Sequence, residues 1–184
     1  VFEHCHPSGS ICLRSIEHGS GKPATRWAPV GFGVALAAAE MARATAEKAG
    51  PAVFCPPLCV FGDQRKENGR QFAGESNILE GPVLSIELDK KPDEGSAKLC
   101  AILGDPTIRV YSGGICAETG KKKQHLHWRL KTPARGPEAL GKLKTARALA
   151  AALAEVYRLQ KQAADGDVEA AFMALSAWSL LGFN

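Results

Sequence analysis

The stretch Val83-Leu84-Ser85-Ile86-Glu87-Leu88-Asp89 is the most strand-like run of this 184-residue chain. Gly81-Pro82 introduces it, and Lys90-Lys91-Pro92 interrupts the pattern after it. Alternate side chains of a strand point to the same face, so Glu87 and Asp89 are expected to project together from its end. Like charges this close favour a divalent cation between them, and Mg²⁺ or Mn²⁺ prefers oxygen ligands. The plainer interpretation is an acidic pair on the solvent face of an amphipathic strand.

The segments on either side of this strand alternate between strand and helix patterns. An alanine-rich stretch predicts one helix, and a longer helix is expected towards the end of the chain. This order predicts an α+β fold, a sheet with helices packed against it. We expect strands at 11–16, 26–30, 107–112 and 125–130, extended segments at 52–54 and 58–61, and helices at 34–48, 93–103 and 138–159.

Two further motifs lie downstream of the acidic pair. In a strand, His125, His127 and Arg129 would share one face, and the apolar residues between them would face the core. Their face would then offer a row of phosphate contacts, although packed or surface histidines give the same pattern. Ser112-Gly113-Gly114, after the strand at 107–112, is expected to form a turn whose amides and hydroxyl could approach a phosphate. A simple hairpin turn is the alternative.

In this order, the segments at 83–89, 110–114 and 125–130 resemble the archaeo-eukaryotic primase superfamily, particularly the primase-polymerases of plasmids and phages. Members carry an acidic-x-acidic pair at a strand end, then a Ser-Gly-Gly turn and a catalytic histidine before an aromatic and a basic residue. The resemblance covers about residues 1–150, which we interpret as the catalytic domain. Residues 151–184 are expected to form a helical tail that is truncated or divergent.

The resemblance implies a palm-like sheet related to the RNA-recognition fold that performs metal-dependent nucleotidyl transfer. The reaction would be primer synthesis or DNA-templated polymerisation for a plasmid, a phage or another mobile element. Glu87 and Asp89 would bind Mg²⁺ or Mn²⁺, and His125 would be catalytic, with His127 as the alternative. The expected partners are a single-stranded DNA template and nucleoside triphosphates, with any helicase supplied by another domain or protein. The expected phosphate contacts are Ser112, Gly113, His125, His127 and Arg129.

The chain departs from the family pattern in three places. The first acid is Glu87 where many relatives have aspartate, and a polar insertion at 115–124 separates the glycines from the histidine. The insertion is either a hairpin tip that carries lysines towards substrate or a variable loop. A third carboxylate is expected after the long helix, where Asp167 is the candidate metal ligand. The alternative for Asp167 is a turn between two helices.

Charge and cysteine content indicate which ligands and which cellular compartment are to be expected. The net charge is +4, and two basic clusters are expected to contact nucleic acid. The six cysteines form no CxxC pair, so we interpret them as structural thiols of a reducing compartment rather than zinc ligands. We expect a cytoplasmic protein without a membrane span, and the start at Val1 suggests a fragment or a processed chain. The basic clusters are Arg65, Lys66 and Arg70, and Lys121, Lys122 and Lys123.

Two other functions fit the same residues. The first is a nucleic-acid-binding or origin-recognition module whose catalytic site has degenerated. The second is a metal-dependent nuclease that uses Glu87, Asp89 and a histidine. The sequence leaves the choice between ribo- and deoxynucleotides open.

Overall fold

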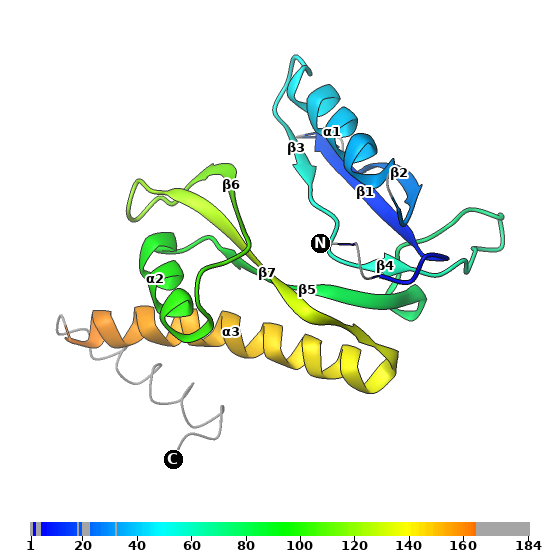
Figure 1. Cartoon of the computed structure of the whole chain (residues 1–184). Coiled ribbons are helices and arrows are strands. Elements are labelled where there is room, and N and C mark those ends of the chain that lie inside the picture. Colours follow the sequence, from blue (N-terminus) through cyan, green and yellow to red (C-terminus); the bar gives the residue numbers. More distant parts are fainter. Residues whose placement is uncertain (1, 3–4, 18, 20–22, 32, 165–184) are drawn as a thin grey trace. The chain divides into compact units, whose positions relative to one another are not determined.

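The computed structural model describes residues 2, 5–17, 19, 23–31 and 33–164. The chain divides into two compact units (Figure 1). The first comprises Val1–Val83 and Leu130–Leu140, and the second comprises Leu84–Arg129 and Gly141–Asn184. The predicted domain boundary at residue 150 lies inside helix α3 (Gly136–Ala164), whose last residues form the described part of the expected tail.

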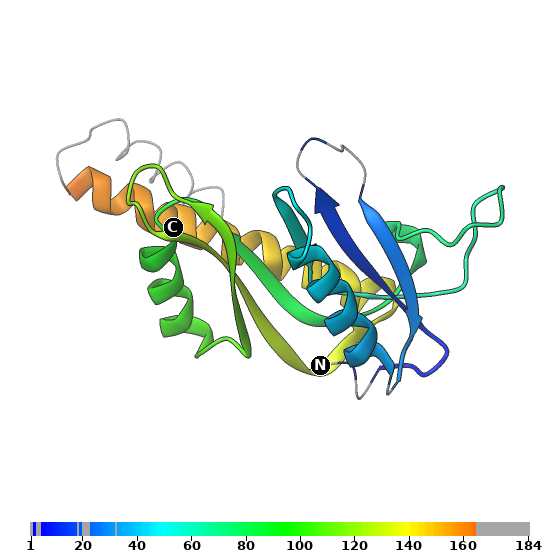
Figure 2. The same ribbon diagram turned by 90° about the horizontal axis from the view of Figure 1, so that it is seen from above.

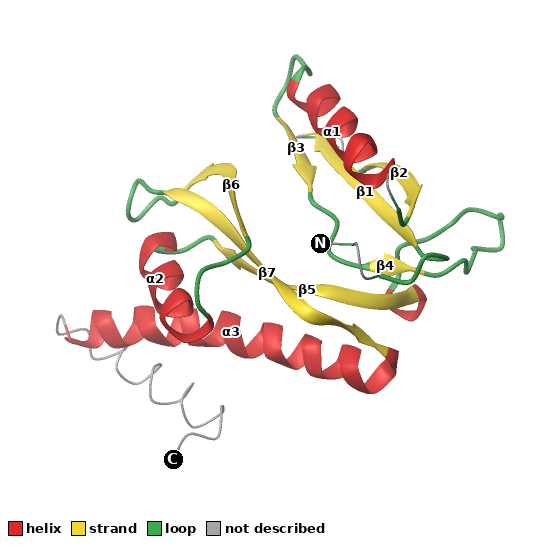
Figure 3. Cartoon of the chain, viewed as in Figure 1, coloured by secondary structure: helices red, strands yellow, loops and turns green. Residues whose placement is uncertain are grey.

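The fold is α+β, as predicted, and its strands form one antiparallel sheet (Figure 3). The strand order is β2-β1-β4-β5-β7-β6, and β3 pairs separately with β1. Most predicted elements are confirmed with small changes in their ends. The strands are β1 (Ser10–Glu17), β2 (Ala24–Pro29), β3 (Ala52–Cys55), β4 (Val60–Phe61), β5 (Ile78–Leu88), β6 (Ile108–Ile115) and β7 (Lys122–Arg135). The helices are α1 (Gly33–Ala46), α2 (Pro92–Leu103) and α3, with a short 3₁₀ turn at Glu75–Asn77.

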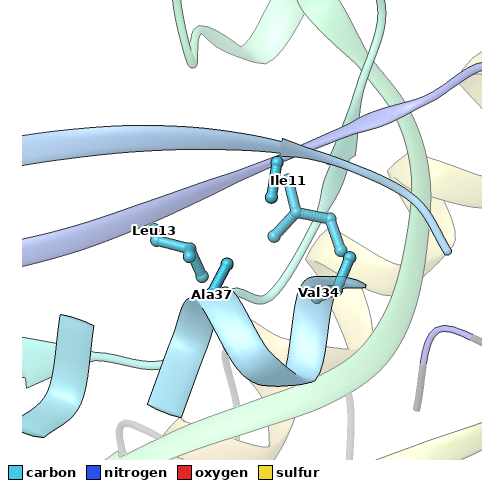
Figure 4. Close-up of a cluster of buried hydrophobic side chains, with 5 residues drawn as sticks. Ile11, Leu13, Val34 and Ala37 are labelled. Atoms are coloured by element: carbon cyan, nitrogen blue, oxygen red, sulfur yellow. The ribbon is translucent and has the colours of Figure 1, made fainter. Parts of the chain in front are cut away.

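The core of the first unit lies between β1 and helix α1. Ile11 and Leu13 are fully buried on one face of β1 and pack against Val34 and Ala37 of the helix (Figure 4). Alanine favours the helical backbone, and its small side chain lets the helix approach the strand closely. The apolar alternation of β1 and the alanine-rich helix therefore pack as one layer on another.

Strand β5 begins at Ile78, earlier than the predicted start at Val83, and Gly81 and Pro82 lie within it. The early part of β5 pairs with β4, where Val60 lies opposite Glu80. This pairing joins segments that are distant in sequence, so local sequence patterns did not indicate it. The predicted start of the strand was too late for this reason.

A buried acid lies in the same part of β5. Glu80 is 2% exposed, and its carboxylate accepts hydrogen bonds from Arg135 Nε at 2.5 Å and from the His6 backbone N–H at 3.0 Å. Burial, followed by the influence of Glu80, raises the pKa of the Cys5 thiol to about 11. Glu80 is thus a polar centre of the first unit that links β5, β7 and the opening segment.

The second unit is built on β5, α2, β6 and β7. Strand β7 lies between β5 and β6 in the sheet, so β5-α2-β6 is a split βαβ arrangement. Trp128 Nε1 donates a hydrogen bond to the Gly104 carbonyl at the end of α2, at 3.0 Å. Figure 2 shows the ribbon of helices α2 and α3 from above. A Cβ on Gly95 of α2 would meet Leu88 of β5 at 3.2 Å and Ala154 of α3 at 3.6 Å. Both helices therefore pack closely around Gly95, on the face of β5 that carries Leu88.

The cysteines and the helices bear on the predicted compartment. The six cysteines, all within the described residues, form no disulfide, and Cys5, Cys12 and Cys116 are buried. Within the described ranges, no helix is both long enough and apolar enough to cross a membrane.

We predict that Glu80→Ala lowers the free energy of unfolding by about 2–3 kcal/mol, because hydrogen bonds to a charged group are lost in a buried place. Urea denaturation of the full chain measures this change. Glu47→Ala is the matched control, because Glu47 is exposed and forms an exposed ion pair with Arg43; its effect should stay within about 0.5 kcal/mol. Equal stability of the two variants would contradict the structural role of Glu80.

Candidate functional site

The acidic pair lies where β5 ends, in the second unit. Glu87 and Asp89 are exposed. Ile86, which precedes them, and Leu88, which lies between them, are buried, with exposed fractions of 1% and 4%. This alternation confirms that the two acids share the face of the strand that is turned away from the apolar core. The strand therefore presents two carboxylates together at one point of the surface.

Each carboxylate has a basic partner on β7. His125 Nε2 lies 3.0 Å from Glu87 Oε1, and Lys123 Nζ lies 3.3 Å from Asp89 Oδ1. The two pairs advance in opposite directions along their strands, as expected for antiparallel neighbours. His125 Nε2 is buried and does not have hydrogen-bond geometry towards Glu87, so this contact is one of proximity and becomes an ion pair when the imidazole is protonated. The sequence analysis had assigned Lys123 to nucleic acid and missed its pairing with Asp89.

His127 is next to this cluster and differs from His125 in its surroundings. It is only 5% exposed, and its ring centroid lies 6.4 Å from that of His125. Burial, and then the charge of His125, lowers the pKa of His127 below 6.5. Neither ring nitrogen has a hydrogen-bond partner in the part of the chain that the structure describes. Its predicted phosphate contact stays a prediction, as does that of the exposed Arg129.

The opposite face of β7 is held by a polar network that the sequence analysis missed. Arg109 of β6 donates to Gln124 Oε1 at 2.5 Å and to Ser96 Oγ at 2.6 Å. Gln124 Nε2 in turn donates to Asp93 Oδ1 at 2.7 Å, at the start of α2. The network connects the hairpin to the helix that follows Asp89. Its one sequence signal is a charged residue, Arg109, inside an otherwise apolar strand.

The predicted turn at Ser112-Gly113-Gly114 was wrong, because these residues continue β6 to Ile115. The pairing of β6 with β7 shifts register between Tyr111 and Ile115, so the glycines form an irregularity within the strand. Gly113 has φ +82°, a conformation that favours glycine. A Cβ on Gly114 would lie 2.8 Å from Cδ of Lys123. The absence of a side chain at Gly114 therefore leaves room for Lys123, which reaches Asp89.

The polar insertion is a hairpin tip, one of the two alternatives that the sequence left open. Cys116 N–H donates to the Lys121 carbonyl at 2.8 Å, and Gly120 N–H donates to the Cys116 carbonyl at 2.9 Å. Hydrogen bonds from the Thr119 hydroxyl and from the Lys91 backbone lower the pKa of the Cys116 thiol. The thiol thus connects the tip to the loop that follows Asp89.

The remaining predicted residues lie elsewhere. Arg65, Lys66 and Arg70 form an exposed loop of the first unit, where Arg65 pairs with Asp63 at 3.1 Å. The predicted third metal ligand, Asp167, lies outside the described residues. The structure therefore brings together Glu87, Asp89, Lys123 and His125, and it assigns the two basic clusters to different units.

The donor set suits one mode of metal binding. Considering the described residues alone, no group of three or more His, Cys, Asp or Glu side chains could hold a metal ion. Mg²⁺ is usually bound through one or two carboxylates, and substrate phosphates and water complete its coordination. Glu87 and Asp89, exposed and on one face, fit that mode and not a site closed by protein ligands alone.

Comparison of the chain with protein-family models, with curated proteins and with solved structures found no match. The resemblance to primase-polymerases accordingly stays a prediction.

We predict that the stability of the chain falls on mild acidification because of His127. Its pKa is lower in the folded chain than the 6.5 of the unfolded chain, so the unfolded state binds this proton first as the pH falls. Stability is retained above about pH 6.5 and lost towards the folded-state pKa, with a slope of at most about 1.4 kcal/mol per pH unit.

Urea denaturation between about pH 7.5 and 5.5 measures this slope. His127→Gln should reduce it, whereas His6→Gln, at an exposed histidine, should leave it unchanged. Identical slopes for the parent and His127→Gln would contradict the predicted depression of the His127 pKa.

Proposed function

We propose that the chain is a metal-dependent nucleotidyltransferase that extends or synthesises a primer on single-stranded DNA. The observation that carries this proposal is the meeting of two strand-end carboxylates with two basic side chains on one sheet face, Glu87 with His125 and Asp89 with Lys123. Phosphoryl transfer depends mainly on positioning and on neutralising charge, and it needs little covalent chemistry from the protein. Carboxylates for Mg²⁺ and cations for phosphates are the groups that such a reaction requires.

In this proposal, Glu87 and Asp89 hold Mg²⁺ or Mn²⁺, which supplies positive charge at the reacting phosphate when bound. His125 and Lys123 each have a second use. While no substrate is bound, they compensate the carboxylates, and both are donors of the kind that bind phosphate oxygens. The nucleoside triphosphate would therefore meet cations that are already oriented towards its site.

The backbone arrangement supports the palm-like fold that the resemblance implies. In the split βαβ of the second unit, β7 lies between β5 and β6, which brings the acids of one strand beside the bases of another. Helix α2 is attached to the other face of β7 through Gln124 and Trp128. The face with the carboxylates is thus supported from behind, and rigid support of this kind favours a catalytic use.

A second candidate is a DNA-binding module without catalytic activity. It is favoured by the same contacts, because Lys123 already neutralises Asp89 without a metal and a protonated His125 would do the same for Glu87. Such a module would bind DNA in a salt-sensitive manner but would not extend it.

We predict that Asp89→Asn reduces template-directed nucleotide incorporation at least about 100-fold, because the change removes a metal-binding charge but keeps the shape of the side chain. The assay follows extension of a labelled primer on single-stranded DNA with Mg²⁺ or Mn²⁺ and either ribo- or deoxynucleotides. Asp105→Asn is the matched control, an exposed aspartate on the loop after α2, and it should retain activity.

Full extension by Asp89→Asn would overturn the proposed role of the carboxylates. DNA binding without extension by any form would favour the binding module. Shortening of the labelled primer, lost in Asp89→Asn, would instead identify a nuclease.

A further inference from the structure

Tyr111 on strand β6 stands out among the aromatic side chains. It is 56% exposed, whereas every other aromatic residue whose burial the structure describes is buried or half-buried. An exposed tyrosine ring contributes nothing to the core of the second unit. It does offer a flat apolar face on which a nucleic-acid base can stack.

The ammonium group of Lys122 lies over one face of this ring. Its Nζ is 5.9 Å from the centroid of Tyr111, within the range of a cation–π contact. The two flanking lysines face carboxylates, Lys121 facing Asp93 and Lys123 facing Asp89. Lys122 makes no ion pair with any carboxylate among residues 33–164, so its charge is available to a ligand.

We propose that Tyr111 and Lys122 form a site for one nucleotide of single-stranded DNA, with a base stacked on the ring and a phosphate on the ammonium group. A base and its phosphate are joined by one sugar, and the aromatic ring and cation here are correspondingly adjacent. Single-strand binding proteins combine the same two elements, aromatic platforms and positive charge along the backbone. The DNA ligand rests on the proposed function.

The register of the hairpin places this site relative to the acidic pair. Tyr111 lies opposite Gln124, and Lys122 precedes Gln124 by two residues on the same strand face. Lys123 and His125, which contact the acids, alternate with them on the other face. Because β6 is the last strand of the sheet, a DNA strand could pass around its edge from one face to the other.

The test measures binding of the full chain to a fluorescein-labelled oligothymidylate of about 16 nucleotides by fluorescence anisotropy. Tyr111→Ala should weaken binding about 5- to 150-fold, the range for loss of one stacked base, and Tyr111→Phe should stay within about twofold. Lys122→Gln should reduce the slope of log affinity against log salt by about 0.7. Ile115→Ala is the control on the same hairpin, because Ile115 is equally exposed, at 55%, but not aromatic.

A second probe separates stacking from an effect on the fold. With an abasic oligomer of the same length, the parent and Tyr111→Ala should bind equally, because there is no base to stack. Equal weakening of both oligomers by Tyr111→Ala, or no binding of oligothymidylate by the parent at low salt, would overturn the proposal.

Asp89→Asn distinguishes this proposal from the proposed function, since it should abolish extension and retain DNA binding. Binding that depends on Tyr111 in a chain that never extends a primer would support the site and overturn the transferase. If the parent extends a primer and Tyr111→Ala binds DNA with unchanged affinity, the transferase would be supported and the Tyr111 site overturned.

Discussion

The pairing of acids on and just after β5 with basic side chains on β7 recurs in both units and positions the candidate site. In the first unit, Glu80 is buried against Arg135, and in the second, Glu87 and Asp89 meet His125 and Lys123. The two kinds of pair differ in solvent access. The buried carboxylate of Glu80 accepts hydrogen bonds from Arg135 and from the His6 backbone, and it stabilises the first unit. The exposed carboxylates of Glu87 and Asp89 are open to solvent beside their partners, so they can accept other ligands.

Because of this difference, the exposed carboxylates of the second unit are free to bind a ligand, whereas the buried carboxylate of the first unit is not. An exposed carboxylate that pairs with a lysine, as Asp89 does with Lys123, can exchange that partner for another cation at small cost, because exposed ion pairs contribute little to stability. The network of Arg109, Gln124 and Asp93 holds the opposite face of the same strands. A site for a charged substrate requires both features, a hydrogen-bonded face that holds the strands in place and an exposed face whose ion pairs can be exchanged.

Sequence patterns indicated much of this arrangement. Alternation predicted the shared face of Glu87 and Asp89, and alanine content predicted α1. The errors have a common physical source in pairing between distant segments. The positive φ of Gly113 is compatible with a turn or a bulge, and only its partner strand selects the bulge. Three other features likewise depend on neighbours that local patterns do not specify. They are the burial of His127, the start of β5 and the contact of Lys123 with Asp89.

The irregularity at Gly113 has a further consequence for the behaviour of the protein in concentrated solution. Strand β6 ends the sheet and exposes Ile108 and Ile115, so its free backbone groups could pair with the same strand of a second molecule. A bulge breaks the regular spacing of those groups and increases the local twist, which makes such a continuous ladder unfavourable. We therefore expect the irregular strand at Gly113 to oppose edge-to-edge pairing of two molecules.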